Sequence, residues 1–451
     1  MNTQTQNPVE YAIQQDKQDR RPHSITVGPD GYLYVTTHYK CVMQINPNDP
    51  NTQVPKTSDM PTLSAGIIRD PKGLSSIWFA SPAHEQEYDP IFEFEVAPEW
   101  RYLKKHDLGK DARAQTITQV RIMTHSYPPA WEDRVLFAEP IRKAVGYVKC
   151  GSSGANFHDM PKGAGNEIFD TWPWSVAASV SEDQKSFRYW VTGQKWDVNP
   201  HKRAVNGVYH FQPGLESKWH RIEMDKPTQV PVHIITDSQY VWVGTMNPNL
   251  IVRIDIKDGS TKSSQVELSG APRQMIFGPD DRIWVAGSDK IYRFKKDDKI
   301  TMDASVTLPD GSEALGLCLD ANQKAVWYTN PRGRKIGRYK IPKAPKGLEG
   351  KTQLESKMVE SLSPGETSDA PIVVRYVTDG NPIPNIPLTC RIVADEATFA
   401  DGSREYVLHT DTAGRVVLPP VWAGNKAEEV RLEVAYADTE PPTTTTIRVG
   451  P

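Results

Sequence analysis

The chain has 451 residues, more than one domain usually contains, so two domains are expected. Hydrophobic residues make up 38% of it and charged residues 24%, proportions that are typical of a globular protein and exclude a chain disordered throughout. The net charge is −3 and the basic residues are scattered, so we expect no nucleic-acid partner.

The N-terminal segment and the cysteines indicate the compartment. Residues 1–21, MNTQTQNPVEYAIQQDKQDRR, contain no apolar core, so no secretory signal is expected. No apolar run approaches the roughly 18–20 residues that span a bilayer, which predicts no membrane insertion. The four cysteines lie far apart without a CxxC pair and are interpreted as buried free thiols. The predicted location is the cytoplasm, or outside the cell after export by a route that needs no cleavable signal.

A five-residue core recurs seven times along the chain. It begins with an apolar residue or tyrosine, continues with a large residue and then a β-branched or aromatic one, and has a small residue in fourth place. The copies are LYVTT (33–37), IWFAS (77–81), VLFAE (135–139), YWVTG (189–193), VWVGT (241–245), IWVAG (283–287) and VWYTN (326–330). Their large residues are about 42 to 58 positions apart, which is the period of propeller blades and too long for leucine-rich or helical repeats.

Each core lies within a group of strand-like segments. A turn with Gly, Pro or Asp precedes many cores, as in ITVGPDGYLYV (25–35), so that a first strand and the core form a hairpin. A third strand follows every core, as in VMQI (42–45), and many units add a variable fourth strand, as in KWHRIEM (218–224). One four-stranded unit cannot bury both of its faces, so the units are predicted to stack into a closed seven-bladed β-propeller. The large core residues are then expected to pack between blades.

After the seventh unit the composition changes. Residues 341–369 are rich in Lys, Glu, Pro and Ser, which indicates a linker that contributes at most one strand to the last blade. From about residue 370 six short strands with turn signals follow, which predicts a β-sandwich. The predicted organisation is all-β, with a propeller at 1–343, a linker at 344–369 and a sandwich at 370–451.

Two stretches resemble known families. The run PHSITVGPDGYLYVTTHYKCVMQI (22–45) and the ending KIGRYK (335–340) resemble the blades of streptogramin B lyases, the virginiamycin B lyase family. Residues 382–424, above all TDTAGRVVLP (410–419), are similar to bacterial immunoglobulin-like domains of the invasin and intimin type. The first resemblance implies the seven-bladed fold, and the second implies a spacer or docking module.

The lyase resemblance implies particular functional positions. These enzymes open a cyclic depsipeptide by elimination, with a histidine general base and a magnesium ion that polarises the group accepting charge. The key residues lie in a Pro–X–small–Ile motif at the start of the innermost strands; we call the X position the slot. Aligned on this motif, the seven slots hold His23, Ala65, Val120, Trp174, Val232, Arg273 and Leu315.

Most of the catalytic residues that the resemblance implies are replaced. The sixth and seventh slots, which hold histidine in the family, contain Arg273 and Leu315. Arginine is always charged near neutral pH and cannot act as a base. Of the two glutamates expected, Glu313 matches one, whereas the other falls near Asn330 or Pro331. No residue is therefore assigned as catalytic, and His23 and Glu313 remain the candidates. A shift of one or two positions in the alignment brings His233 close to a slot.

The open face of the propeller is the predicted ligand-binding surface. It is expected to carry His23, Trp174 and Arg273 from the slots and Tyr88, Trp196 and His201 from long loops, a mixture of aromatic and hydrogen-bonding groups typical of sites for sugars or peptides.

Three functions remain open. The first is a non-catalytic protein that binds a small molecule, glycan or protein surface, with the second domain as spacer. The second is a magnesium-dependent lyase or lactone-acting enzyme with a rearranged site. The third is a structural part of a larger assembly. No metal ligands are assigned, and no cofactor is expected unless the lyase interpretation holds.

Overall fold

The computed structural model divides the chain into two compact units, Met1–Ile341 and Pro342–Pro451. It describes residues 7–13, 20–37, 41–56, 66–69, 76–80, 91–96, 100–106, 108, 114, 116–123, 131–152, 154–160, 171–180, 187–195, 206–213, 218–226, 228–278, 282–320, 325–341, 351–354, 361–368, 372–378, 381–382, 387–399, 404–410, 415–418, 421–426, 428–435 and 443–449. All regular secondary structure in these ranges is β, which confirms the predicted all-β class. Within the same ranges no helix is long and apolar enough to cross a membrane.

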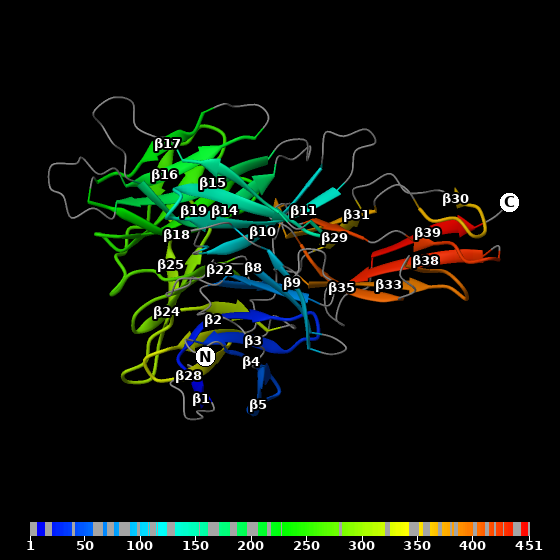
Figure 1. Cartoon of the computed structure of the whole chain (residues 1–451), viewed down its shortest axis with the longest axis horizontal. Coiled ribbons are helices and arrows are strands. Elements are labelled where there is room, and N and C mark those ends of the chain that lie inside the picture. The colour runs from blue at the N-terminus through cyan, green and yellow to red at the C-terminus, as the bar shows by residue number, and fades with distance from the viewer. Residues whose placement is uncertain are drawn as a thin grey trace. The chain divides into compact units, whose positions relative to one another are not determined.

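The first unit is a seven-bladed β-propeller, as predicted (Figure 1). Its first six blades are antiparallel sheets of four consecutive strands. Blades one to three are β2 (Pro22–Val27), β3 (Leu33–Thr37), β4 (Cys41–Asn46) and β5 (Asp49–Lys56); β6 (Gly66–Arg69), β7 (Ser76–Ala80), β8 (Ile91–Glu95) and β9 (Arg101–His106); and β10 (Ile117–Met123), β11 (Trp131–Glu139), β12 (Ala144–Lys149) and β13 (Ala155–Asp159). Blades four to six are β14 (Thr171–Val180), β15 (Phe187–Lys195), β16 (Gly207–Phe211) and β17 (His220–Glu223); β18 (Val230–Thr236), β19 (Tyr240–Met246), β20 (Leu250–Asp255) and β21 (Thr261–Ser263); and β22 (Met275–Phe277), β23 (Arg282–Ala286), β24 (Lys290–Lys295) and β25 (Met302–Thr307).

The seventh blade joins the two ends of the propeller sequence. It consists of β26 (Leu317–Leu319), β27 (Ala325–Asn330), β28 (Lys335–Lys340) and, as the outermost strand, β1 (Val9–Ala12). In Figure 1 the blue β1 lies beside the yellow β28, and the two strands pair antiparallel. The sequence allowed one strand from 341–369 in this blade, but β1 holds the outermost position instead. An outer strand pairs mainly through its backbone, so its four residues leave almost no side-chain pattern in the sequence.

Glu10 ties β1 to the rest of blade seven. Its side chain is only 4% exposed. One carboxylate oxygen accepts hydrogen bonds from the Tyr328 hydroxyl and the Asn330 side-chain amide, both at 3.0 Å, and the other accepts one from Lys335 Nζ at 3.1 Å. The three donors compensate for the cost of burying the carboxylate, so Glu10 stabilises the closure.

The large residues of the seven cores are all buried. Tyr34, Leu136 and the five tryptophans, Trp78, Trp190, Trp242, Trp284 and Trp327, are at most 1% exposed, which confirms their predicted packing role. Burial of each such side chain contributes about 1.5–3 kcal/mol. Two of the indoles also donate hydrogen bonds, Trp190 to Ser179 Oγ at 2.8 Å and Trp242 to Asp237 Oδ2 at 3.0 Å.

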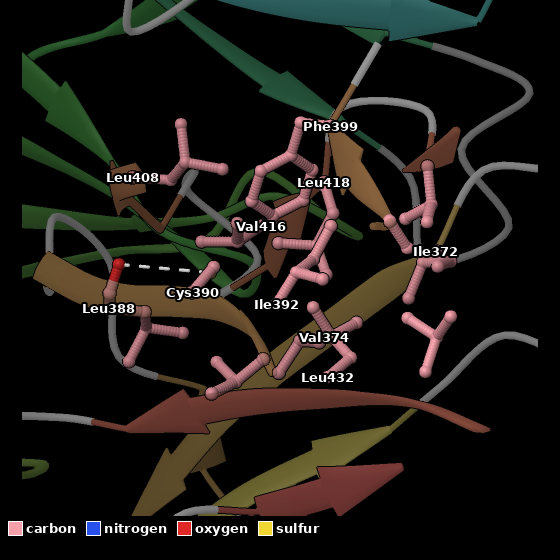
Figure 2. Packing of buried hydrophobic residues seen from close by; sticks show 14 of the residues in the cluster. Ile372, Val374, Leu388, Cys390, Ile392, Phe399, Leu408, Val416, Leu418 and Leu432 are labelled. Carbon is pink, nitrogen blue, oxygen red and sulfur yellow. Dashed lines mark hydrogen bonds between the residues drawn. The ribbon is translucent and has the colours of Figure 1, made fainter. Parts of the chain in front are cut away.

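The second unit is also built from β-strands. One sheet contains β29 (Lys351–Leu354), β31 (Val373–Thr378), β32 (Asn381–Pro382) and β36 (Arg415–Val417). A second sheet has the order β30 (Ser361–Leu362), β39 (Thr443–Val449), β38 (Glu428–Ala435), β33 (Pro387–Val393) and β35 (Glu405–His409), and β34 (Thr398–Phe399) pairs with β37 (Val421–Trp422). Both larger sheets contribute to one apolar core, and Figure 2 shows Val374 of β31 and Val416 of β36 among residues of β33 and β38. The immunoglobulin-like assignment stays a prediction.

The segment 344–369, expected to be a linker, carries two strands of this second unit. β29 pairs with β31, and β30 pairs in parallel with β39. Both are edge strands of four residues or fewer with the sequences KTQL and SL, which lack the apolar alternation that would reveal them.

Candidate ligand-binding site

The first strands of the seven blades form a closed ring. Each one contacts the first strand of the blade before it and of the blade after it, from β2 through β6, β10, β14, β18 and β22 to β26 and back to β2. The starts of these strands therefore lie at the same end of the ring, around its axis. This arrangement brings together residues that are up to about 290 positions apart in the sequence.

The strand register defines the slots independently of the sequence motif. The third core residue of each blade pairs with the residue two positions after the slot; these pairs are Ile25 with Val35, Val176 with Val191, Ile234 with Val243, Met275 with Val285 and Leu317 with Tyr328. Equivalent slots therefore hold Trp174, Val232, Arg273, Leu315 and His23, on blades four, five, six, seven and one. Five consecutive blades thus present an aromatic, two aliphatic and two basic side chains.

In blade three the register corrects the sequence alignment. Ile117 pairs with Phe137, the third core residue, whereas Val120 pairs with Arg134. The slot is thus position 115, not Val120. This strand has several apolar residues and no proline before its slot, so hydrophobic alternation alone does not define its register. Positions 65 and 115 lie outside the described residues, as do the predicted binding residues Tyr88, Trp196 and His201.

A β-bulge separates the slot residue from the strand ladder in three blades. The register shifts between Pro22 and Ile25, between Pro173 and Ser175, and between Pro231 and His233. At a bulge the side chains no longer alternate strictly between the two faces of the sheet, so the side chain of the bulged residue takes a different direction. The slot residues are accordingly exposed or half-buried, whereas the residues two positions later are buried.

The residue after the slot is hydrogen-bonded in each of these five blades, and in two of them the bond joins neighbouring blades. In blades one, four and seven its backbone N–H donates to a threonine hydroxyl of the neighbouring strand, at 2.8–3.1 Å. In blade five His233 Nδ1 accepts the Met275 N–H of blade six at 3.3 Å, and in blade six Gln274 Oε1 accepts the Leu317 N–H of blade seven at 2.7 Å. These side chains link neighbouring blades.

His233 is therefore a structural residue of the ring. Burial lowers the pKa of His233 to about 4, so the imidazole is neutral at pH 7. Its Nδ1 lone pair therefore remains available to accept a hydrogen bond from the Met275 N–H. The register puts it one position after the slot that Val232 holds, so the alignment shift considered from the sequence does not occur.

The two catalytic candidates lie on adjacent blades. His23 is half-buried, with Nδ1 3.1 Å from Ser24 Oγ, and its carbonyl oxygen accepts a hydrogen bond from Thr329 Oγ1 of blade seven at 2.7 Å. Glu313 is half-buried two positions before the blade-seven slot, and its N–H donates to Asn330 Oδ1 at 3.4 Å. No hydrogen bond or ion pair joins the two side chains, although both belong to the described residues.

Asn330 occupies the position where the lyase resemblance implies a second glutamate. It is fully buried, and its side chain binds Glu10 and the backbone N–H groups of Gly333 and Glu313. The carboxylate that Asn330 contacts is that of Glu10, which comes from the opposite end of the propeller sequence. No repeat pattern marks Glu10 or Gln274, so sequence reasoning missed both.

Among the five slots that the structure describes, Arg273 is exposed and the other four residues are half-buried. Its guanidinium makes no hydrogen bond or ion pair with any residue that the structure describes. As for metals, no group of three or more His, Cys, Asp or Glu side chains is arranged to hold an ion in the described ranges.

Comparison with known proteins supports the fold. No family model and no curated protein matches the sequence. Among solved structures, the chain is similar to virginiamycin B lyase from Staphylococcus aureus, with a TM-score of 0.56 and 16% identity over 74% of this chain and 99% of that chain. It is also similar to a streptogramin B lyase structure, with a TM-score of 0.53 and 17% identity over 73% and 96% of the two chains. The predicted resemblance to streptogramin lyases is confirmed for the propeller fold, which by itself does not define an activity.

Proposed function

We propose that this protein is a non-catalytic binding protein whose propeller holds a carbohydrate, peptide or protein surface at the starts of its inner strands. The observation that carries the proposal is the content of two slots. Where the lyase resemblance implies histidines, the register gives Arg273 and Leu315. A guanidinium does not accept a proton near neutral pH, and an isobutyl group binds neither a proton nor a metal ion.

The composition of the slots suits binding. Trp174 offers a flat apolar ring for stacking, and Arg273 and His23 offer hydrogen-bond donors. Val232 and Leu315 add aliphatic surface between them. Binding sites usually combine a few polar groups with mostly apolar surface on a rigid scaffold, and the slots have this composition. The second unit is proposed to act as a spacer or docking module.

A binding screen tests this function. The full chain is applied to glycan and peptide arrays, and hits are measured by calorimetry with the wild type and with Trp174→Ala. Loss of about 1–3 kcal/mol of binding free energy is expected on removal of a stacking aromatic ring. Tyr32→Ala is the matched control, since Tyr32 is 38% exposed in the turn between β2 and β3, at the far end of the inner strand. Equal affinity in the wild type and Trp174→Ala would contradict a site at the slots.

The alternative is a magnesium-dependent lyase or lactone-acting enzyme that uses His23 and Glu313, which the ring brings onto neighbouring blades. A streptogramin B antibiotic and a simple lactone are incubated with the protein, with and without magnesium, and products are followed by mass spectrometry. Magnesium-dependent turnover that His23→Ala abolishes would replace the binding proposal with this one. Large assemblies that disappear on removal of residues 342–451 would instead favour a structural role.

A further inference from the structure

We infer that the ligand bound at the slots carries a carboxylate, and that Arg273 recognises it. This inference rests on the proposed function and specifies the chemistry of its ligand. The starting observation is a contrast among arginines. In blades five to seven Arg253, Arg282, Arg293 and Arg338 each lie within 4 Å of an aspartate, at 3.0, 2.9, 2.9 and 3.9 Å. Arg273 and the exposed turn residue Arg332 have no such acidic partner in the described part of the chain, and of these two Arg273 is the one at a slot.

The backbone of Arg273 is fixed from both sides. Its N–H donates to the Ala286 carbonyl of its own blade at 2.9 Å. Pro272 packs so closely on Gly244 of blade five that a Cβ at Gly244 would lie 2.9 Å from the proline ring. On the other side Gln274 binds the inner strand of blade seven. A side chain on so rigid a base loses less conformational freedom when it binds a ligand, which raises affinity.

The neighbours of Arg273 strengthen an anionic contact. The adjacent slots hold Val232 and Leu315, which are half-buried and aliphatic. A ligand seated between them displaces water from around the guanidinium, and an ion pair is stronger in a less polar environment. The planar guanidinium matches a carboxylate with two parallel N–H···O bonds. The ligand is therefore a molecule with an apolar or ring-shaped body next to a carboxylate group.

A carboxylate of this kind occurs both in acidic sugars and at the carboxyl terminus of peptides, and the experiment distinguishes the two. One pair of probes is a uronic-acid oligosaccharide and its methyl ester, and the other is a peptide with a free carboxyl terminus and its amide. Affinities for the full-length protein are measured by calorimetry. One of the two acids is expected to bind roughly 10- to 100-fold more tightly than its neutral form, the usual effect of a charged hydrogen bond. The pair that responds identifies the source.

Variants assign the effect to Arg273. Arg273→Gln is expected to remove the preference for the acid, and Arg273→Lys to retain only part of it because the ammonium cannot form the two-pronged contact. Lys299→Gln is the matched control: it removes one exposed positive charge from the turn between β24 and β25, at the opposite end of blade six. It is expected to leave the preference unchanged.

Three results would overturn the inference. If neutral ligands from the arrays bind and neither acid is preferred over its neutral form, the carboxylate assignment is wrong while the binding function stands. If Arg273→Gln keeps the preference, another cation recognises the acid. If the wild type binds none of the probes and no array ligand, the inference and the proposed function fail together.

Discussion

Replacement of Glu10 by alanine is expected to weaken the closure of the propeller. The change removes the acceptor for the Tyr328 hydroxyl and the Asn330 amide, two donors inside blade seven. Each lost hydrogen bond costs about 1 kcal/mol, and donors left without a partner in the interior raise the cost. The contact with Lys335 adds little, because that side chain is 42% exposed and water replaces the carboxylate. Together these effects predict a loss of about 2–4 kcal/mol in unfolding free energy.

The chemistry of Tyr328 supports this estimate. Burial, and then the nearby Glu10 carboxylate, raise the pKa of the Tyr328 hydroxyl. The hydroxyl therefore keeps its proton at any physiological pH and donates a hydrogen bond to Glu10. Glu10→Gln has the same shape and keeps one acceptor oxygen for Tyr328 and Asn330, but it loses the charge and replaces the oxygen that contacts Lys335 with an NH2 donor. It is expected to cost about half as much as Glu10→Ala or less.

Urea unfolding followed by tryptophan fluorescence measures the effect. Eleven of the twelve tryptophans lie in the first 341 residues, so the signal reports on the propeller rather than on the second unit. Val9→Thr is the matched control, since Val9 is 53% exposed in the same strand and threonine is also β-branched. If Glu10→Ala changes the unfolding free energy no more than Val9→Thr does, β1 does not close the ring in the way described.

Two further changes test the packing and the ring. Gly146→Ala would put a Cβ 2.0 Å from the buried Phe137 ring and is expected to lower the unfolding free energy by about 1–3 kcal/mol. Gly154→Ala is the control, because a Cβ there meets nothing within 4 Å, and it should leave the unfolding free energy unchanged. Equal urea midpoints for the two variants would contradict the packing of Gly146 on Phe137. Burial lowers the pKa of His233 to about 4 from 6.5, so its stabilising contribution is complete above pH 6.5 and falls towards pH 4. From pH 7 to pH 5 the wild type should therefore lose about 1–2 kcal/mol more than His233→Asn, whose amide oxygen can still accept the Met275 N–H; parallel pH profiles would show that His233 is not buried as described.

The seven-fold repeat was readable because its cause is local. The residue that packs between blades must be large in every blade, so the same five-residue core recurs from 33–37 to 326–330. Proline before the slot fixed the alignment in blades one, four, five and six. In blade three no proline precedes the slot, and the alignment on Val120 was wrong.

The strands that escaped prediction are edge strands. β1, β29 and β30 contain four residues or fewer, and each binds its neighbour chiefly through backbone groups that every residue possesses. Their partners are also remote: Glu10 meets Tyr328 across 318 positions of sequence. Neither composition nor alternation can report such a pairing.

For the candidate site, the sequence alone determined which residue types stand in the slots of every blade except the third, because the motif that carries them is local to each inner strand. It also placed Arg273 and Leu315 in the two slots where the lyase resemblance implies histidines. Only the tertiary structure decided which of the polar groups are engaged: His233 and Gln274 bind the backbone of the next blade, and Asn330 binds Glu10. The physical reason is that whether a polar side chain has a partner depends on atoms from other blades, which meet only when the ring closes.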